Sequence, residues 1–442
     1  MIDNLSAKIV HKEANIGIIG LGYVGLPLLL AAFNQDFPVL GIDVDLQKVE
    51  ALKKGQSYIH HIPCEKIAPL SQSELFDATT DFSRLKECGV ILICVPTPLT
   101  KHREPDMTYV VETSKAIAPH LQKGQLIILE STTYPGTTEE VMKPILEQHS
   151  LKSTVDFFLA YSPEREDPGN PSFETTTIPK VVGGEGEFAQ KLASTFYQQL
   201  TIKTVPVSTL ATAEAVKLTE NIFRCINIAL VNELKIVFDA MGINVWEVIN
   251  AAKTKPFGFM PFYPGPGLGG HCIPIDPFYL TWKAREFGLT TKFIELAGEI
   301  NTSMPKYVVQ KLHEALDQRF QKGLKGTRVL LVGLAYKKNV DDIRESPSFV
   351  LMEELKKRGA LVEYYDPYVP EILPMREHQE FIGQKSIKFP EDLSQYEVAL
   401  ICTDHDQVDY ELLTRSLPLV VDSRNATGRI TDESLRAKIV LA

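Results

Sequence analysis

The stretch Ile16-Gly-Ile-Ile-Gly20-Leu-Gly22-Tyr-Val-Gly25 decides the fold of this chain. A short run of β-branched residues enters glycines with G-x-G-x-x-G spacing, and good helix formers follow over 26–33, so the stretch predicts a strand, a turn and a helix. In that arrangement backbone N–H groups and the helix dipole receive a pyrophosphate. The spacing alone is a weak signal, because such glycines also permit close packing of helix on strand.

Asp43 adds weight to the phosphate-binding interpretation. It ends a second apolar run, 38–42, eighteen residues beyond Gly25. A carboxylate at this place accepts hydrogen bonds from the ribose hydroxyls and repels a ribose phosphate. We therefore predict NAD, rather than NADP, as the cofactor, and packing alone becomes the minor alternative for the glycines.

Apolar runs recur along both ends of the chain. Runs at 90–95 and 125–129 continue the first α/β pattern, and runs at 329–332, 361–365, 396–402 and 417–421 predict a second one. Between them, 213–241 contains neither Gly nor Pro and predicts one long helix. The fold class is therefore α/β, with two Rossmann-like doubly wound parallel-sheet domains joined by a central helical domain; the predicted boundaries are 1–212, 213–305 and 306–442.

Composition narrows the class of ligand. The 442 residues carry a formal net charge of −10, which gives no basic surface for nucleic acid or an anionic membrane. The six cysteines show no C-x-x-C pairing, so we expect neither a disulfide framework nor a metal site, and we expect a cytoplasmic protein. We find no export signal and no apolar run long enough for a membrane span.

The loop Gly265-Pro-Gly-Leu-Gly-Gly-His-Cys272-Ile-Pro-Ile-Asp276 places a thiol four residues before a carboxylate. Its glycines let a ligand approach the backbone closely, so the loop suits an activated nucleophile at Cys272. The other five cysteines lie in apolar strand-like or helical runs, where inert core packing is the expected role. His271 is expected to be structural, because adjacent side chains usually point apart.

Two further groups are ambiguous on the residues alone. Lys217 and Asn221 lie one turn apart on one face of the predicted long helix, where they form either an oxyanion site or, as periodicity alone favours, a solvated polar face. Glu164 lies in Ser162-Pro-Glu-Arg-Glu166, after the apolar run 155–160. A catalytic base and a surface ion pair are about equally compatible with its position.

Seven segments together resemble the UDP-glucose/GDP-mannose dehydrogenase family, and they span nearly the whole chain in order. They are Gly20–Gly25, Val95-Pro-Thr-Pro98, Glu130-Ser-Thr132, Ser162-Pro-Glu164, Lys217 with Asn221, Gly265–Asp276, and Gly333-Leu-Ala-Tyr-Lys337 with Arg344-Glu-Ser-Pro347. The resemblance implies an N-terminal NAD domain, a central helix that supports a homodimer or higher homo-oligomer, and a C-terminal domain that holds the nucleotide diphosphate.

The resemblance also implies site residues. The cofactor would be lined by Gly20, Gly22, Tyr23, Val24, Gly25, Asp43, Lys48, Pro96, Thr97, Thr132 and Arg344. The nucleotide sugar would be held by Glu164, Arg165, Lys217, Asn221, Tyr263, Gly265, Gly269, Lys337 and Arg424. In this family the C6 alcohol is oxidised in two hydride transfers, and a cysteine holds the intermediate as a thiohemiacetal and then a thioester. Cys272 would be that nucleophile.

The other catalytic roles follow from the same resemblance. Lys217 and Asn221 would stabilise the oxyanions, Asp276 and Glu164 would manage protons and water, and Thr132 would position that water. The sequence differs from the pattern of the family in two places. Ile275 occupies a position where many members carry lysine, and 253–262 lacks the subunit-crossing arginine of some members.

The stretches 162–169 and 253–263 look most like the N-acetylhexosamine branch, so the predicted reaction is oxidation of UDP-N-acetylglucosamine to the uronate, for surface polysaccharide synthesis. UDP-glucose, UDP-N-acetylgalactosamine and UDP-N-acetylmannosamine are the alternatives. A two-electron dehydrogenase of hydroxy acids or sugar phosphates would not need Cys272. A non-enzymatic nucleotide sensor would leave Lys217, Asn221 and Cys272 without a purpose.

Overall fold

The computed structural model describes residues 2–59, 62–100, 102–165, 176–270, 273–375, 377–391 and 393–442. The chain forms two compact units: residues 1–221 with 275–290, and residues 222–274 with 291–442. The three-part division expected from the sequence stays a prediction. Its second boundary, at 305, falls inside a helix that continues to Phe320.

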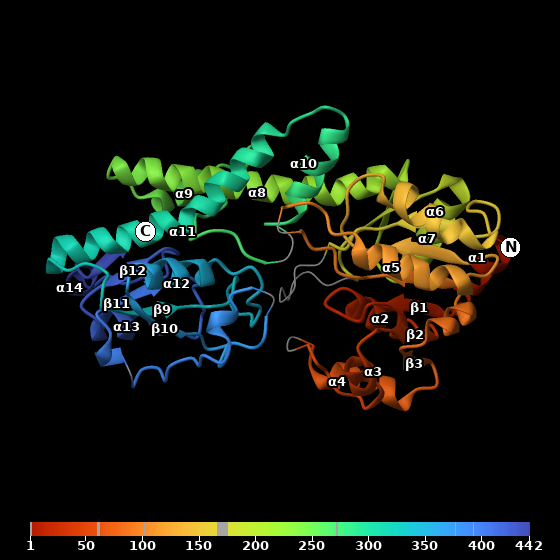
Figure 1. Cartoon of the computed structure of the whole chain (residues 1–442), viewed down its shortest axis with the longest axis horizontal. Helices are drawn as coiled ribbons and strands as arrows, with labels where there is room; N and C mark the ends of the chain where they lie inside the picture. Colours follow the sequence, from red (N-terminus) through yellow and green to blue (C-terminus); the bar gives the residue numbers. More distant parts are fainter. Residues whose placement is uncertain are drawn as a thin grey trace. The chain divides into compact units, whose positions relative to one another are not determined.

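The first unit is built on an eight-stranded sheet with the order β3-β2-β1-β4-β5-β6-β7-β8 (Figure 1). All neighbouring strands are parallel except β6 and β7. The strands are β1 (Ile16–Ile19), β2 (Val39–Ile42), β3 (Phe76–Thr79), β4 (Val90–Ile93), β5 (Leu126–Leu129), β6 (Phe158–Tyr161), β7 (Lys180–Gly184) and β8 (Thr204–Val207). The strand order reverses between β1 and β4, which is where open α/β sheets bind ligands beyond the carboxyl ends of the strands.

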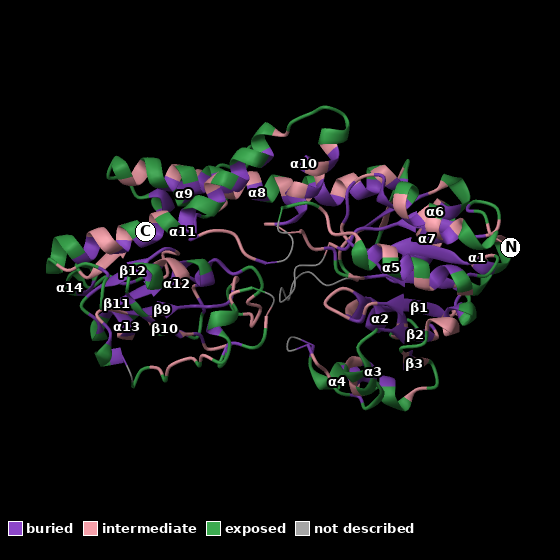
Figure 2. Cartoon of the chain, in the orientation of Figure 1, coloured by how far each residue is buried: buried purple, intermediate pink, exposed green. Residues whose placement is uncertain are grey.

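Both faces of this sheet are covered, as Figure 2 shows by the buried colour of its strands. Alternate residues of β1 divide between two cores: Ile18 packs in the core that contains the helix side chains Leu29 and Leu192, and Ile19 in the core that contains Val110. A sheet buried on both faces explains the unbroken apolar strands. The helices of the unit are α1 (Ile2–Val10), α2 (Gly25–Phe33), α3 (Leu46–Lys53), α4 (Cys64–Ile67), α5 (Thr108–Ile117), α6 (Lys143–Leu146), α7 (Gly186–Tyr197) and α10 (Asp276–Glu286).

The second unit contains a five-stranded, all-parallel sheet with the order β10-β9-β11-β12-β13. Its strands are β9 (Arg328–Val332), β10 (Leu361–Tyr365), β11 (Val398–Ile401), β12 (Val420–Asp422) and β13 (Ile439–Leu441), and its helices are α9 (Val245–Ala252), α11 (Lys292–Phe320), α12 (Pro347–Lys357), α13 (Tyr410–Ser416) and α14 (Glu433–Arg436). The predicted doubly wound α/β class with two parallel-dominated sheets is confirmed.

Two helices are much longer than the rest. The predicted long helix is confirmed as α8 (Leu210–Ala240), whose residues contribute to both units. The second, α11, has 29 residues and was not predicted, because Pro305 within it normally marks the end of a helix. In the described part of the chain, no helix has the length and apolarity needed to cross a membrane.

The core role expected for five cysteines is wrong for Cys64. This residue is exposed at the start of α4, whereas Cys88, Cys94, Cys225 and Cys402 are buried. Cys64 is the first residue of the four-residue helix α4, in which Ile67 is the buried residue. Local apolar sequence therefore does not ensure burial at a helix end.

Candidate active site

The glycine turn after β1 has the geometry of a phosphate-binding turn. Gly20 has a φ of 88°, and a β-carbon there would lie 2.5 Å from the carbonyl oxygen of Cys94. A β-carbon on Gly25 would lie 1.9 Å from the Gly20 oxygen, so α2 packs directly on the turn. A β-carbon on Gly22 would meet nothing within 4 Å. Packing therefore requires the outer glycines, whereas Gly22 leaves backbone accessible to a ligand.

Asp43, directly after β2, lies against this turn and is buried. Its Oδ2 accepts a hydrogen bond from the backbone N–H of Leu21 at 2.8 Å, and the Lys48 ammonium lies 3.3 Å away. Its Oδ1 accepts from the N–H of Asp45 at 2.9 Å. The carboxylate is thus fixed at the place where a ribose would follow the pyrophosphate, and these residues fit NAD.

The loops after β4 and β5 complete the cofactor side of the first unit. Thr97 is buried, and its carbonyl oxygen accepts from the Tyr279 hydroxyl of α10 at 2.9 Å. The Ser131 hydroxyl donates to the Val95 carbonyl at 2.7 Å. Of the other predicted cofactor contacts, Tyr23, Val24 and Thr132 are half-buried and Pro96 is exposed. Tyr279, which sequence reasoning missed, thus ties α10, the helix that begins at the predicted catalytic residue Asp276, to the Thr97 loop.

Two polar residues of α8, Lys217 and Asn221, are buried, so the solvated-face alternative for them is wrong. Asp276, at the first position of α10, is buried as well. The Asn221 amide donates from Nδ2 to Oδ2 of Asp276 at 2.5 Å. Burial raises the pKa of Asp276 to about 7, against the opposing effects of the Lys217 charge and the Asn221 hydrogen bond.

Glu164 is also buried, so the surface ion pair that was its alternative is wrong. Lys217 donates from Nζ to its backbone carbonyl at 2.5 Å, and Lys180 Nζ lies 3.0 Å from its Oε2. The more exposed ion pair of this segment is formed by the next residue, Arg165. Its guanidinium bonds Glu220 at 2.6 Å and donates to the Pro179 carbonyl at 2.7 Å, so a role for Arg165 toward the sugar stays a prediction.

Sequence reasoning missed a buried group of charges beside Glu164. Lys180, the first residue of β7, bridges Glu164 and Glu130 with Nζ–O distances of 3.0 and 2.7 Å. Tyr197, at the end of α7, donates its hydroxyl to the other oxygen of Glu130. The available signal was a lysine at the start of an otherwise apolar strand, but the sequence does not show which carboxylates it meets.

In the second unit, the glycine loop packs on the segment 336–347. The Gly265 N–H donates to Oδ1 of Asn232, and the Gly270 N–H donates to the Arg344 carbonyl, both at 3.0 Å. A β-carbon on Gly269 would lie 2.5 Å from Cβ of Tyr336. Close packing therefore excludes a side chain there. His271 and Cys272, to which this loop leads, lie outside the described residues.

The predicted sugar-binding side chains of the second unit differ in their exposure and in what they contact. Arg424 adjoins the loop, since its guanidinium nitrogen lies 2.5 Å from where a β-carbon of Gly265 would be, and Lys337 is half-buried. Tyr263 is more exposed and donates its hydroxyl to Asn250 at 3.1 Å. Arg344, predicted to line the cofactor, pairs with Asp342 at 2.6 Å.

The second unit repeats the glycine turn of the first. Gly333 has a φ of 89°, and Asp366 follows β10 as Asp43 follows β2. Asp366, however, accepts hydrogen bonds from the N–H groups of Leu334 and Ala335 and pairs with His405 at 3.0 Å, fully buried. Both carboxylates accept hydrogen bonds from the N–H groups of their turns, but among the described residues only Asp366 is also paired with a fully buried histidine.

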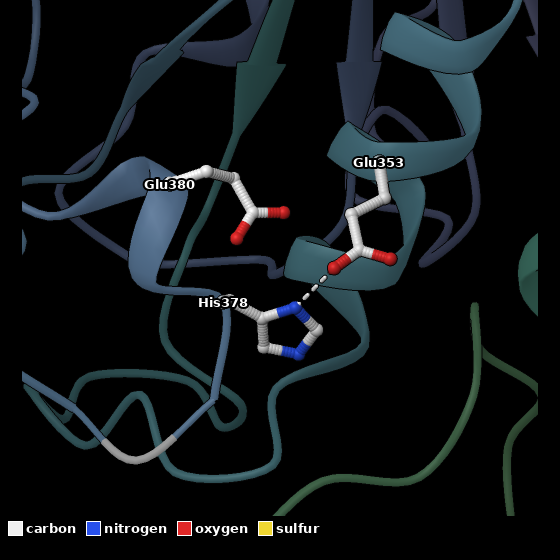
Figure 3. Close-up of side chains that lie close together, drawn as sticks. All are labelled: Glu353, His378 and Glu380. Carbon is white, nitrogen blue, oxygen red and sulfur yellow. Dashed lines mark hydrogen bonds and ion pairs between the residues drawn. The ribbon is translucent and has the colours of Figure 1, made fainter.

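One grouping of possible metal ligands occurs among the described residues, formed by Glu353 of α12, His378 and Glu380 (Figure 3). His378 Nδ1 lies 2.5 Å from a Glu353 oxygen, and its ring stacks on Phe349 at 5.2 Å. Glu380 is exposed, and Lys357 lies 3.6 Å from Glu353. These contacts fasten the segment around His378 to α12, and a lysine already offsets the acidic charge.

Comparison with known proteins places the chain in one family. The UDP-glucose/GDP-mannose dehydrogenase family matches with its NAD binding domain over residues 14–201, its central domain over 211–303 and its UDP binding domain over 330–429. The chain is 39% identical over 360 residues to UDP-N-acetyl-D-glucosamine 6-dehydrogenase of Pseudomonas aeruginosa, covering 81% of this chain and 84% of that protein. It is 35% identical to the Salmonella typhi enzyme of the same name, covering 89% and 91%.

A solved structure agrees with the sequence comparison. The UDP-D-ManNAc dehydrogenase of Pyrococcus horikoshii superposes with a TM-score of 0.84 at 31% identity, over 93% of this chain and 96% of that one. The resemblance seen in the motifs is therefore confirmed, as are the predicted NAD cofactor and the oxidoreductase class. The chain belongs to the UDP-glucose/GDP-mannose dehydrogenase family, the NAD-dependent dehydrogenases of nucleotide sugars.

Proposed function

We propose that this protein oxidises the C6 alcohol of UDP-N-acetylglucosamine to the carboxylate, in a four-electron oxidation made of two hydride transfers that passes through a covalent intermediate on Cys272. The observation that carries the reaction type is the buried group of Lys217, Asn221 and Asp276 beyond the carboxyl ends of the parallel strands. NAD held at the turn after β1 would supply the hydride acceptor for each of the two oxidations. The remaining chemistry belongs to side chains of this chain.

Asp276 is the proposed base for the alcohol proton. General bases work best when their pKa lies near the working pH, and burial raises the pKa of Asp276 to about 7. Lys217 and Asn221 stabilise the oxyanion that develops as the proton leaves. An ammonium has three N–H groups and an amide two, and among the described residues one of each donates within the site.

Cys272 makes the second oxidation possible. Its thiolate adds to the aldehyde, and the resulting thiohemiacetal gives up the second hydride to become a thioester. Water then attacks the thioester, releasing the uronate and restoring the thiol. We assign the orientation of this water to Glu164 and Thr132, which follow the neighbouring strands β6 and β5.

The choice of sugar rests on relatives and on two stretches of sequence. Two N-acetylglucosamine 6-dehydrogenases are among the similar proteins, and 253–263 supplies aromatic and small residues that suit an acetamido methyl. The similarity to the Pyrococcus mannosamine enzyme makes the epimeric UDP-N-acetylmannosamine the second candidate.

A substrate panel tests both the reaction and the sugar. NADH and uronate are measured with UDP-N-acetylglucosamine, its manno and galacto epimers, UDP-glucose and GDP-mannose. We expect the highest kcat/KM for UDP-N-acetylglucosamine, with two NADH per uronate. Higher kcat/KM for another sugar overturns the proposed substrate, and one NADH per product overturns the four-electron reaction.

We further propose a homodimer, or a higher homo-oligomer built on it, that uses α8. Phe223, Leu230 and Val237 recur every seven residues on this helix and are 49%, 49% and 46% exposed. Residues at that spacing share one helix face. An exposed apolar stripe of this kind favours burial against a second copy of the same helix, because a two-fold interface pairs identical surfaces.

A further inference from the structure

Lys180 is a buried cation shared between two carboxylates. Its side chain is 4% exposed, and its Nζ lies 2.7 Å from Oε2 of Glu130 and 3.0 Å from Oε2 of Glu164. The three residues come from separate segments: the start of β7, the end of β5 and the loop after β6. Only the folded sheet brings them together, and Glu164 is the one of the three with a proposed role at the thioester.

Every oxygen of the two carboxylates has a protein partner. Oε1 of Glu164 accepts from the N–H of Arg165 at 2.5 Å, and Oε1 of Glu130 accepts from the Tyr197 hydroxyl. Glu164 is thus held at both of its carboxylate oxygens. Glu130 is held deeper in the unit, with an exposure of 1%.

The charges around this group are unbalanced. Lys180 faces two carboxylates, and the other titratable groups close by are Lys217 on α8, Tyr197 on α7, Tyr161 on β6 and Cys94 after β4. Burial raises the pKa of Glu130 to about 7 and the pKa values of Tyr161, Tyr197 and Cys94 still further, so these last three are neutral. Among the interactions of the described residues, Lys180 is therefore the cation that pairs with the carboxylate of Glu164.

We propose that Lys180 is a positioning residue for Glu164, and that Glu130 in turn positions Lys180. The ammonium fixes Glu164 in its ionised form and in the orientation that directs water to the thioester. Loss of Lys180 would let the carboxylate turn and take up a proton. Glu130 competes for the same ammonium, so Lys180 and Glu130 have opposite effects on the protonation of Glu164. This inference rests on the water-orienting role proposed for Glu164.

A purely structural role for the Lys180 ion pairs would lead to a different experimental result. Buried ion pairs contribute little net stability, and replacing both partners with neutral groups is often tolerated. If Lys180 only joined β5 to β7, its loss would lower thermal stability and leave the balance between the oxidation and hydrolysis steps unchanged. The experiment therefore measures that balance directly.

The main variant is Lys180→Met, measured with Lys180→Arg, Glu130→Gln and the double variant Lys180→Met/Glu130→Gln, which removes both buried charges. We expect Lys180→Met to give a burst of two NADH per active site, followed by uronate release slowed at least 10-fold. Mass spectrometry of the stalled enzyme should show the acyl adduct. Lys180→Arg should restore most of the rate, because it keeps the cation.

The pH profile of uronate release gives a second readout with a defined sign. Removing the cation favours protonation of Glu164, so in Lys180→Met the acid limb should move to higher pH. Removing the competing carboxylate favours ionisation of Glu164, so in Glu130→Gln the limb should move to lower pH. The double variant should still show the burst, because Glu164 has lost its cation.

Lys283→Met is the matched control. Lys283 is another buried lysine of the same unit, between Glu140 and Glu286 at 2.6 and 2.7 Å, and it does not contact Glu164. Equal behaviour of Lys180→Met and Lys283→Met, without a burst or pH shift, overturns the inference. If the parent enzyme itself gives one NADH per product, the proposed function fails, whatever the Lys180 variants do.

Discussion

The side-chain amide of Asn221 on α8 donates a hydrogen bond to the Asp276 carboxylate at the start of α10, across 55 residues of sequence. The contact joins the proposed oxyanion donor to the proposed base. It also opposes the effect of burial on the Asp276 pKa, which stands at about 7.

Asn221→Ala should therefore change the pH profile as well as the rate. A hydrogen bond to a charged group contributes about 1.5–3 kcal/mol, so its loss should raise the pKa of Asp276 by about one to two units. Because the base must be ionised, activity rises with pH, and the acid limb of kcat should move above neutrality. The rate at the plateau should also fall about 100-fold as an oxyanion donor is lost. Asn227→Ala is the control, because Asn227 is a half-buried asparagine of the same helix that donates to the Phe223 carbonyl. An unchanged limb in Asn221→Ala contradicts the coupling.

Gly22→Ala should separate cofactor binding from folding. A β-carbon there meets no protein atom within 4 Å, so thermal stability without NAD should match that of the parent. A methyl group at the position of close backbone approach should weaken NAD at least 10-fold, measured by calorimetry, and reduce the stabilisation that NAD provides. Gly25→Ala is the contrasting variant and should be unstable, because its β-carbon would lie 1.9 Å from the Gly20 oxygen. Normal NAD affinity in Gly22→Ala would place the pyrophosphate elsewhere.

Cys272→Ser should stop uronate formation while nucleotide-sugar binding persists. A serine hydroxyl is much less ionised than a thiol near neutral pH, so the addition to the aldehyde should fail. Steady-state uronate release measures the loss of activity, and calorimetry with the UDP-sugar measures the binding that should persist. Near-parental rates in this variant rule out covalent catalysis at Cys272.

Alkylation adds a test of the same thiol. Cys64 is exposed, whereas burial raises the pKa values of Cys88, Cys94, Cys225 and Cys402 and so suppresses their reaction. In a Cys64→Ser background, inactivation should follow labelling of Cys272, and the UDP-sugar should protect it. Inactivation without label on Cys272 contradicts the assignment.

Leu230→Glu should weaken the proposed dimer. It places a charge in the middle of the apolar stripe formed by Phe223, Leu230 and Val237. Sedimentation or light scattering should show a shift toward the monomer by at least 10-fold in dissociation constant. Leu373→Glu, which changes a leucine that is 66% exposed elsewhere in the same unit, should leave the assembly unchanged. An unaltered dimer in Leu230→Glu moves the interface away from α8.

Local sequence predicted the elements that carry their own signals. The glycine turn, the unbroken apolar strands and α8 depend on spacing and periodicity within a few turns of chain, and all three are present. The 29-residue α11 was missed, because its internal Pro305 reads as a helix end unless the surrounding packing is known. Likewise, the exposure of Cys64 depends on what lies around α4 rather than on its neighbours in sequence.

By itself the sequence determined the family, the cofactor and the chemical types available to the site, because motifs such as Gly20–Gly25 and Lys217 with Asn221 consist of residues close together along the chain. Only the tertiary structure decided which of those residues are buried and what they contact. Lys180, Glu130 and Glu164 lie on three separate segments, so no spacing in the sequence reveals their shared contacts. The pKa of Asp276 likewise depends on desolvation, which arises only when the chain folds around the carboxylate.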